Sequence, residues 1–185
     1  MFPGLSGLGG IAVNPISVRD FTVLAALVCC RLLAHACTTA VVSGEVTRDG
    51  RPLLWKNRDS SHSHNELVFC DDGRYGYLGI TNAGDEPGME IWAGLNSAGF
   101  AIMNSASYNV EKPGQRKDGE GRWMKVALQC CRSVDDFEKL LEKSNAGGRD
   151  VAANFGVIDR FGGAAFFETG AHTYRRYDAS DPQQA

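Results

Sequence analysis

Short β-branched and apolar segments, separated by clusters of glycine, asparagine and aspartate, fill most of this 185-residue sequence after residue 37. Such alternation predicts short strands joined by tight turns. The expected strands span 38–44, 52–57, 66–70, 75–81, 90–96, 99–105, 154–159, 164–168 and 173–177. The polar stretch 110–121, which contains proline and glycine, is expected to be a loop. Trp55, Trp92 and Trp123 are expected to be core aromatics.

Two helices are expected between the sixth and seventh strands. In the first, apolar residues recur at helical spacing on one stripe, namely Trp123, Val126, Ala127, Cys130 and Cys131. In the second, Ser133 is the expected N-cap, with Asp135 and Asp136 in the first turn. Its expected buried face consists of Phe137, Leu140 and Leu141. Strands, a helix pair and further strands predict an α+β fold with helices layered on an antiparallel sheet.

The first 36 residues have the pattern of a secretory signal peptide. The apolar run 21–30 follows Arg19, and the segment ends in Ala34-His35-Ala36, with small residues at −3 and −1 from the expected cleavage point. This run is too short for an ordinary membrane-spanning helix. We therefore expect a secreted or periplasmic protein without stable membrane insertion. A wrongly assigned start or an unstructured extension is the alternative.

Cleavage after Ala36 leaves Cys37 as the first residue, with a free α-amine. A cysteine of this kind carries a nucleophile and a general base in one residue, since the amine accepts the thiol proton. Cys37 is therefore the candidate nucleophile of an acyl-transfer reaction. Two alternatives remain: a buried cysteine at the start of a strand, and a lipid-modified cysteine that anchors a surface binding protein.

Composition and cysteine spacing argue against several other functions. A net charge of −3 and a pI near 5.8 give no basic footprint for nucleic acid or an anionic membrane. Cys70, Cys130 and Cys131 match no zinc spacing or disulfide framework and are expected to be small buried hydrophobes. The pair His62 and His64 is expected in a polar loop. No metal and no cofactor is expected, and the sequence leaves the oligomeric state open.

The expected first hairpin brings further polar residues toward Cys37. If Asp49-Gly50 is a two-residue turn, Ala40 faces Asp59 and Cys37 faces His62. The segment 56–59 then ends close to Cys37 on the partner strand. Strict alternation places Lys56 and Arg58 on the face of Cys37, whereas Asp59 needs a bulge or a register shift to reach it.

Several motifs, in order, resemble one known family. They are Cys37-Thr38-Thr39, the stretch DGRPLLWKNRD, GLNSAGFAIMN (94–104) and NFGVIDRFGGAAFFE (154–168). Together they resemble the N-terminal-nucleophile cysteine hydrolases of linear amides. This group includes choloylglycine hydrolases, penicillin V acylases and acyl-CoA:6-aminopenicillanate acyltransferase-like proteins.

The resemblance implies a four-layer αββα sandwich with the nucleophile at the edge of a central strand. Asp59 matches the carboxylate that orients the α-amine, and Lys56 stands where the family usually has arginine. Arg58 is expected to compensate for this change and to bind substrate. The oxyanion asparagine of the family falls on Asn104, with Asn96 as runner-up and as a second substrate-binding candidate.

The resemblance also implies a domain organisation and an activity. Residues 37–178 correspond to the N-terminal part of the family domain, and 179–185 to a polar tail or truncation point. A further asparagine and arginine of the family come after the last strand pair seen here. The implied function is cleavage of a small-molecule linear amide through a thioester on Cys37. A dipeptidase or an acyltransferase of the same fold is the alternative.

Overall fold

The computed structural model describes residues 37–107 and 119–184. The expected leader and most of the expected loop 110–121 lie outside these residues. Of the described residues, no helix combines the length and the apolar character that crossing a bilayer requires.

Most of the described strands form one antiparallel sheet of seven, in the order β3–β4–β5–β6–β7–β8–β9. They are β3 (Asn65–Cys70), β4 (Tyr77–Asn82), β5 (Ala93–Asn96), β6 (Phe100–Ala106), β7 (Ala153–Asp159), β8 (Ala164–Thr169) and β9 (Tyr174–Asp178). A separate antiparallel pair consists of β1 (Thr38–Val42) and β2 (Leu53–Asn57). All expected strands are therefore present, with small shifts at their ends.

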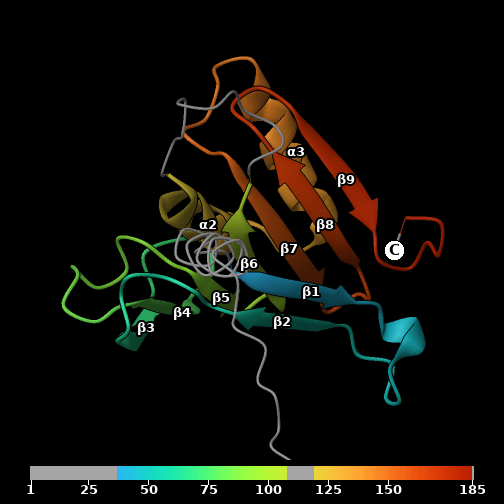
Figure 1. Ribbon diagram of the computed structural model, residues 1–185, viewed down its shortest axis with the longest axis horizontal. Helices are drawn as coiled ribbons and strands as arrows, with labels where there is room; N and C mark the ends of the chain where they lie inside the picture. The colour runs from blue at the N-terminus through green and yellow to red at the C-terminus, as the bar shows by residue number, and fades with distance from the viewer. Residues whose placement is uncertain (1–36, 108–118, 185) are drawn as a thin grey trace, which may run out of the picture. The chain divides into compact units, whose positions relative to one another are not determined.

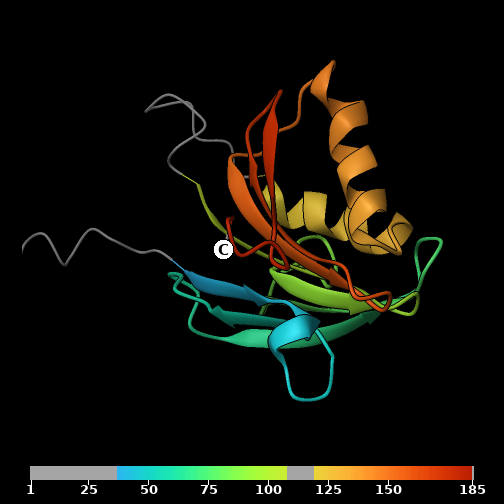
Figure 2. The same cartoon turned by 90° about the vertical axis from the view of Figure 1, so that its right-hand side faces the viewer.

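The helices and the strand pair lie on opposite faces of the large sheet (Figures 1 and 2). Helix α2 (Glu120–Cys130) packs over β5 and β6, and α3 (Val134–Asn145) packs over β7. On the other face, β1 crosses β7 and β8 while β2 crosses β6 and β7. The expected α+β class is confirmed, and three layers are present in the described residues: helices, large sheet and small sheet.

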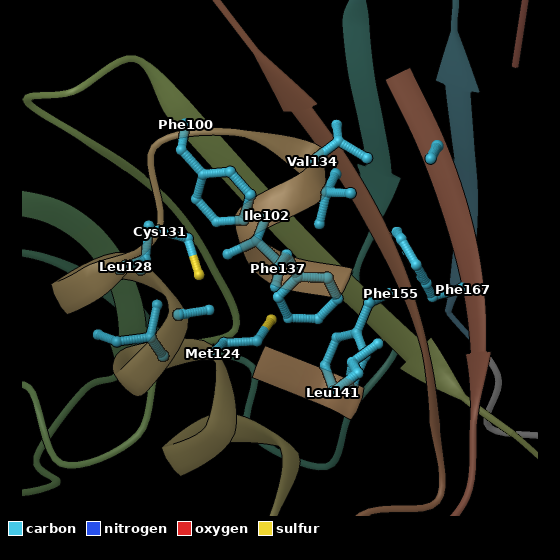
Figure 3. Close-up of a cluster of buried hydrophobic side chains, with 14 of the residues drawn as sticks. Phe100, Ile102, Met124, Leu128, Cys131, Val134, Phe137, Leu141, Phe155 and Phe167 are labelled. Carbon is cyan, nitrogen blue, oxygen red and sulfur yellow. The ribbon is translucent and has the colours of Figure 1, made fainter. Parts of the chain in front are cut away.

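A cluster of aromatic rings fills the space between the helices and the large sheet (Figure 3). Phe137 of α3 is fully buried and lies 5.6 Å from the ring centroid of Phe155 and 5.3 Å from that of Phe167, both in edge-on contacts. Its ring is also 6.1 Å from that of Phe100. Because Phe137 contacts rings from three strands, it is the side chain that joins α3 to the sheet.

Ser133 caps α3 as expected. It has extended backbone angles, and its side chain accepts a hydrogen bond from the backbone N–H of Asp136. The predicted face of this helix is also confirmed: Phe137 and Leu141 are buried, and Leu140 packs partly buried against the same core.

The small sheet lies close to the large one because β7 has a glycine at the crossing point. A Cβ on Gly156 would stand 2.7 Å from Cε of Met103 and 2.8 Å from Cγ2 of Val41 in β1, so any side chain at this position would force a neighbour to shift. At the far end of β1, the hydroxyl oxygens of Ser43 and Ser180 lie 2.8 Å apart. This bond ties the β1 end to the segment 179–184, which continues from β9 in hydrogen-bonded turns.

The predicted register of β1 and β2 is wrong. Ala40 lies opposite Trp55 rather than Asp59. One step beyond the last pair, Thr38 and Asn57, the ladder leads from Cys37 to Arg58 rather than to His62. The reason is the connection, in which Ser43 caps a short 3₁₀ turn at Gly44–Val46 before Gly50 turns the chain at a φ of 73°. Residues that the two-residue hairpin had assigned to the strand ladder therefore belong to this longer connection.

The predicted buried face of the first helix is only partly right. Ala127 and Cys131 are buried and Trp123 packs against the core, but Val126 and Cys130 are exposed. Met124 and Leu128, which the prediction left out, are buried as well. Apolar residues occur on both sides of this helix, so their spacing alone does not decide which face is buried. The expected loop ends earlier than predicted, because the helix already starts at Glu120.

Two further expectations of burial are wrong. Cys131 is buried and Cys70 partly so, but Cys130 is exposed. Trp55 is 54% exposed, because it lies with Leu53 on the exposed side of β2, whose residues alternate between exposed and partly buried.

We expect Phe137→Ala to lower the free energy of unfolding by about 3–5 kcal/mol, since it removes the ring that three strands contact. Urea denaturation measures this change. Phe161→Ala is the matched control, because Phe161 is 67% exposed and its loss should change stability by less than about 0.5 kcal/mol. Equal losses in the two variants would contradict the central place of Phe137.

Candidate active site

Cys37 lies immediately before β1 and is half-buried. Its thiol donates a hydrogen bond to the backbone carbonyl oxygen of Asp59, with Sγ and oxygen 3.7 Å apart. The shifted register explains this contact. It places Arg58, the residue after β2, level with Cys37, so that Asp59 comes next along the chain. The register shift therefore brings the backbone of Asp59 to Cys37.

Lys56 points inward from β2 and crosses to the large sheet. Its Nζ donates to the carbonyl oxygen of Trp92 at 2.7 Å and to Oδ1 of Asn104 at 2.6 Å. Burial lowers the pKa of Lys56 to about 8; the positive charge of Arg58 acts in the same direction, while Cys37 and Glu120 oppose the shift. The ammonium group is thus held near the thiol by two neutral acceptors in a poorly hydrated position.

Asn104 is buried in β6, and its amide orientation follows from the bond to Lys56. An ammonium group only donates, so the amide atom facing it is the oxygen. The NH₂ group of Asn104 then points away from Lys56, and no residue in the described part of the chain accepts a hydrogen bond from it. A fixed amide donor of this kind is what an oxyanion site needs.

Arg58 is held at the end of the β3–β4 ladder. Its guanidinium donates to Oδ1 of Asn82 at 2.6 Å and to Oδ1 of Asn65 at 2.5 Å, and it lies 5.2 Å from the ring centroid of Trp92. Burial lowers the pKa of Arg58, an effect that Cys37 and Asp85 oppose. The guanidinium is therefore a second fixed cation within electrostatic reach of Cys37.

Sequence reasoning missed Asn65, Asn82 and Trp92 as neighbours of this cluster. Asn65 and Asn82 are the terminal pair of β3 and β4, so their meeting at Arg58 depends on a register that the sequence does not reveal. Asn82 stands at the end of an expected strand, before a turn, and this was the available signal. Its own amide nitrogen donates to Asp85 at 2.7 Å, which fixes the oxygen toward Arg58.

Asn96 does not join the other predicted residues. Its NH₂ group donates to the carbonyl oxygens of Leu128 and Cys131 at 2.8 and 2.7 Å, and its Oδ1 accepts from the N–H groups of Ala98 and Phe100. These bonds hold the β5–β6 turn against the end of α2. The geometry gives Asn96 a structural role and no support as a substrate-binding residue.

The described residues thus bring Cys37, Lys56, Arg58, Asn104 and the Asp59 backbone into one cluster where β1 begins and β2 ends. Two cations beside a thiol stabilise negative charge that develops on sulfur or on a nearby oxyanion. The described residues contain no group of histidine, cysteine and carboxylate side chains arranged to hold a metal ion. The chemistry that this cluster suits is nucleophilic attack by the thiol.

We expect the stability contribution of Lys56 to increase with pH. Between about pH 8 and pH 10.5 the unfolded chain keeps the Lys56 proton and the folded chain has lost it, so the free energy of unfolding rises with pH in this window. Relative to Lys56→Met, the wild type should gain at most about 3 kcal/mol across the window. Urea unfolding from pH 7.5 to 10.5 measures this gain.

Lys56→Arg is the control, because a guanidinium stays charged throughout this range. The difference in the free energy of unfolding between Lys56→Arg and Lys56→Met should therefore stay constant across this window. The difference between the wild type and Lys56→Met should grow. Parallel wild-type and Lys56→Met curves would show that burial does not shift the titration of Lys56.

Comparisons with known proteins place the fold and the motifs in one family. The sequence matches the family model for acyl-coenzyme A:6-aminopenicillanic acid acyl-transferase over residues 46–181. No curated protein sequence gives a significant match. Among solved structures, a mutant of conjugated bile acid hydrolase from Clostridium perfringens aligns with a TM-score of 0.51 and 16% identity, over 78% of this chain and 51% of that one.

Penicillin V acylase from Agrobacterium tumefaciens aligns with a TM-score of 0.41 and 15% identity, over 77% of this chain and 40% of that one. The chain thus spans about half the length of the bile acid hydrolase with which it shares a fold. The family match confirms the resemblance drawn from the motifs, and the alignment with the bile acid hydrolase confirms the expected N-terminal-nucleophile hydrolase fold. Because the family model covers most of the sequence, this chain belongs to the acyl-coenzyme A:6-aminopenicillanic acid acyl-transferase family.

Proposed function

We propose that this protein cleaves a linear, non-peptide amide, or transfers its acyl group, with Cys37 as the nucleophile. The observation that carries the proposal is the position of Cys37, at the start of β1 and within electrostatic reach of Lys56 and Arg58. A cysteine with a purely structural role has no need of two partly buried cations. The family membership and the fold agree with acyl-transfer chemistry.

Activation follows from removal of residues 1–36, which frees the α-amine of Cys37. An α-amine has an ordinary pKa of about 7.7–8.0, which suits a general base near neutral pH. The same cleavage would export the protein to the periplasm or the outside of the cell. In this proposal the carboxylate of Asp59 orients the amine. The backbone oxygen of the same residue accepts a hydrogen bond from the Cys37 thiol.

The reaction proceeds in two acyl transfers. The α-amine takes the Sγ proton, and Sγ attacks the amide carbonyl carbon to give a tetrahedral oxyanion. Lys56 and the NH₂ group of Asn104 stabilise this charge, and loss of one such donor costs about 3–4 kcal/mol in comparable sites. The C–N bond then breaks, the α-ammonium returns its proton to the leaving amine, and a thioester remains on Cys37.

In the second step water or an acceptor amine attacks the thioester and regenerates the thiol. Water gives hydrolysis, whereas an amine gives acyl transfer. Arg58 offers its guanidinium to an anionic group of the substrate, since Asn65 and Asn82 use only two of its five N–H donors.

We expect N-terminal sequencing of the purified, secreted protein to begin at Cys37. Cys37→Ala should lower turnover by about 10³-fold or more, because no other group supplies the nucleophile. A panel of bile-salt conjugates, penicillin V, acyl-homoserine lactones and dipeptides measures turnover and separates amide hydrolysis from dipeptidase activity.

Cys130→Ser is the matched control, since Cys130 is an exposed cysteine on α2, outside the cluster. Its turnover should equal that of the wild type. Full activity in protein that retains residue 36 would contradict the mechanism. A fatty acyl group on Cys37, with no hydrolysis, would instead indicate a lipid-anchored binding protein.

We further expect Lys56→Gln to slow alkylation of Cys37 by iodoacetamide at pH 7 by about fivefold, equivalent to about 1 kcal/mol of lost charge interaction. Mass spectrometry of the Cys37 peptide measures the rate, so the test does not depend on turnover. Arg48→Gln removes an exposed cation in the β1–β2 connection and should leave the rate unchanged. An unchanged alkylation rate in Lys56→Gln would contradict the proposed role of the Lys56 charge in activating Cys37.

A further inference from the structure

A second cysteine site lies at the C-terminal end of α2, away from Cys37. Cys130 is the last residue of the helix and is exposed, whereas the adjacent Cys131 is 1% exposed and belongs to the core. Their sulfur atoms are 3.8 Å apart. Two neighbouring thiols therefore have different environments, one open to reagents and one closed to them.

A cavity of about 370 Å³ opens beside Cys130, and its charged lining is mostly basic. The charged side chains are Arg74, Arg132, Asp136, Lys139 and Lys143. The single carboxylate, Asp136, already accepts a hydrogen bond from the backbone N–H of Arg132 at 3.1 Å and lies 3.7 Å from its side chain. In the described part of the chain, Arg74, Lys139 and Lys143 have no ion-pair partner, so the cavity has an excess of positive charge.

The surroundings of Cys130 favour its thiolate. The thiol of Cys131 donates a hydrogen bond toward Cys130 and, with Lys143 and Arg74, lowers the pKa of Cys130 to about 7, against the effects of burial and Asp136. As a thiol, Cys130 instead donates to the carbonyl oxygen of Val126 at 3.1 Å. A partly exposed thiolate among cations is the environment in which cysteines react.

We propose that Cys130 is a site of S-thiolation, where a small disulfide bearing carboxylates binds in the basic cavity and leaves one half attached to the protein. The Cys130 thiolate attacks one sulfur of that disulfide. The S–S bond of the reagent breaks, a new S–S bond forms to Cys130, and the other half leaves as a thiolate. No further oxidant is needed, because the reagent disulfide takes up the electron pair.

Cys131 is poorly suited to resolve the mixed disulfide, because it is buried. Its hydrogen bond to Cys130 and its burial raise its pKa, so it remains a protonated thiol. Adjacent residues have Cα atoms only about 3.8 Å apart across a trans peptide, which is less than the roughly 4.4–6.8 Å that a disulfide usually spans, so a bond between the two needs a change in the backbone at the end of α2. The modification is therefore expected to persist until an external thiol removes it.

The size and charge of the cavity indicate the class of reagent. A volume of about 370 Å³ is within the range of small-molecule pockets and accommodates half of a peptide disulfide. The unpaired cations favour carboxylates, so an anionic disulfide should react faster than a cationic one. The site does not involve Cys37 and does not depend on the proposed amidase activity.

The test uses the full protein with glutathione disulfide as the anionic probe and cystamine as the cationic one, at pH 7. Peptide mass spectrometry measures the rate at Cys130 for each. We expect glutathione disulfide to react at least tenfold faster than cystamine. In the double variant Lys139→Gln/Lys143→Gln this preference should fall to about threefold or less, because both lysines line the cavity and are exposed, so their loss spares the core.

Arg48→Gln, which removes an exposed cation elsewhere, should keep the full preference. Cys37→Ala should also keep it, which separates this proposal from the proposed catalysis. Equal rates for the two probes in the wild type, or labelling mainly at Cys70 or Cys131, would overturn the proposal.

Discussion

The site depends on the hydrogen bonds of the partly buried ammonium group of Lys56. Removing a charge from water costs free energy, and here two strong hydrogen bonds offset part of that cost. One bond goes to the backbone before β5 and the other to the side chain of Asn104 in β6, while Lys56 itself belongs to β2. A single side chain thus ties the small sheet to the large one, fixes the Asn104 amide and places a cation near Cys37.

Most of the fold could be predicted because its signals are local. Turn residues mark the strand ends, and Ser133 with its acidic first turn marks the start of α3. The predictions were wrong where the local sequence pattern is compatible with two structures. Asp49-Gly50 does turn the chain, but Ser43 caps an additional 3₁₀ turn that shifts the β1–β2 register. Similarly, α2 has apolar residues on two faces, and only packing against β5 and β6 selects Met124 and Leu128.

The site was less predictable, because its contacts join residues distant in sequence. Family motifs drew attention to Lys56, Asp59 and Asn104, yet nothing in the sequence indicates that Lys56 bonds to Asn104. The motif GLNSAGFAIMN contains two asparagines, Asn96 and Asn104, and the sequence did not decide between them. The structure does, because Asn96 is used entirely in the turn and helix end, while Asn104 keeps an amide donor. Asn65 and Asn82 became visible only through the β3–β4 pairing.

Lysine rather than arginine at position 56 suits this geometry and changes its chemistry. The two acceptors are the backbone carbonyl oxygen of Trp92, before β5, and the side-chain oxygen of Asn104 in β6. A compact ammonium group reaches both, whereas the planar fork of arginine matches a single carboxylate. Two of its three donors are used, which leaves one for a substrate oxyanion. Arg58 nearby supplies a charge that does not titrate near neutral pH. The cluster therefore combines a permanent cation with one whose pKa of about 8 makes the local field sensitive to mild alkalinity.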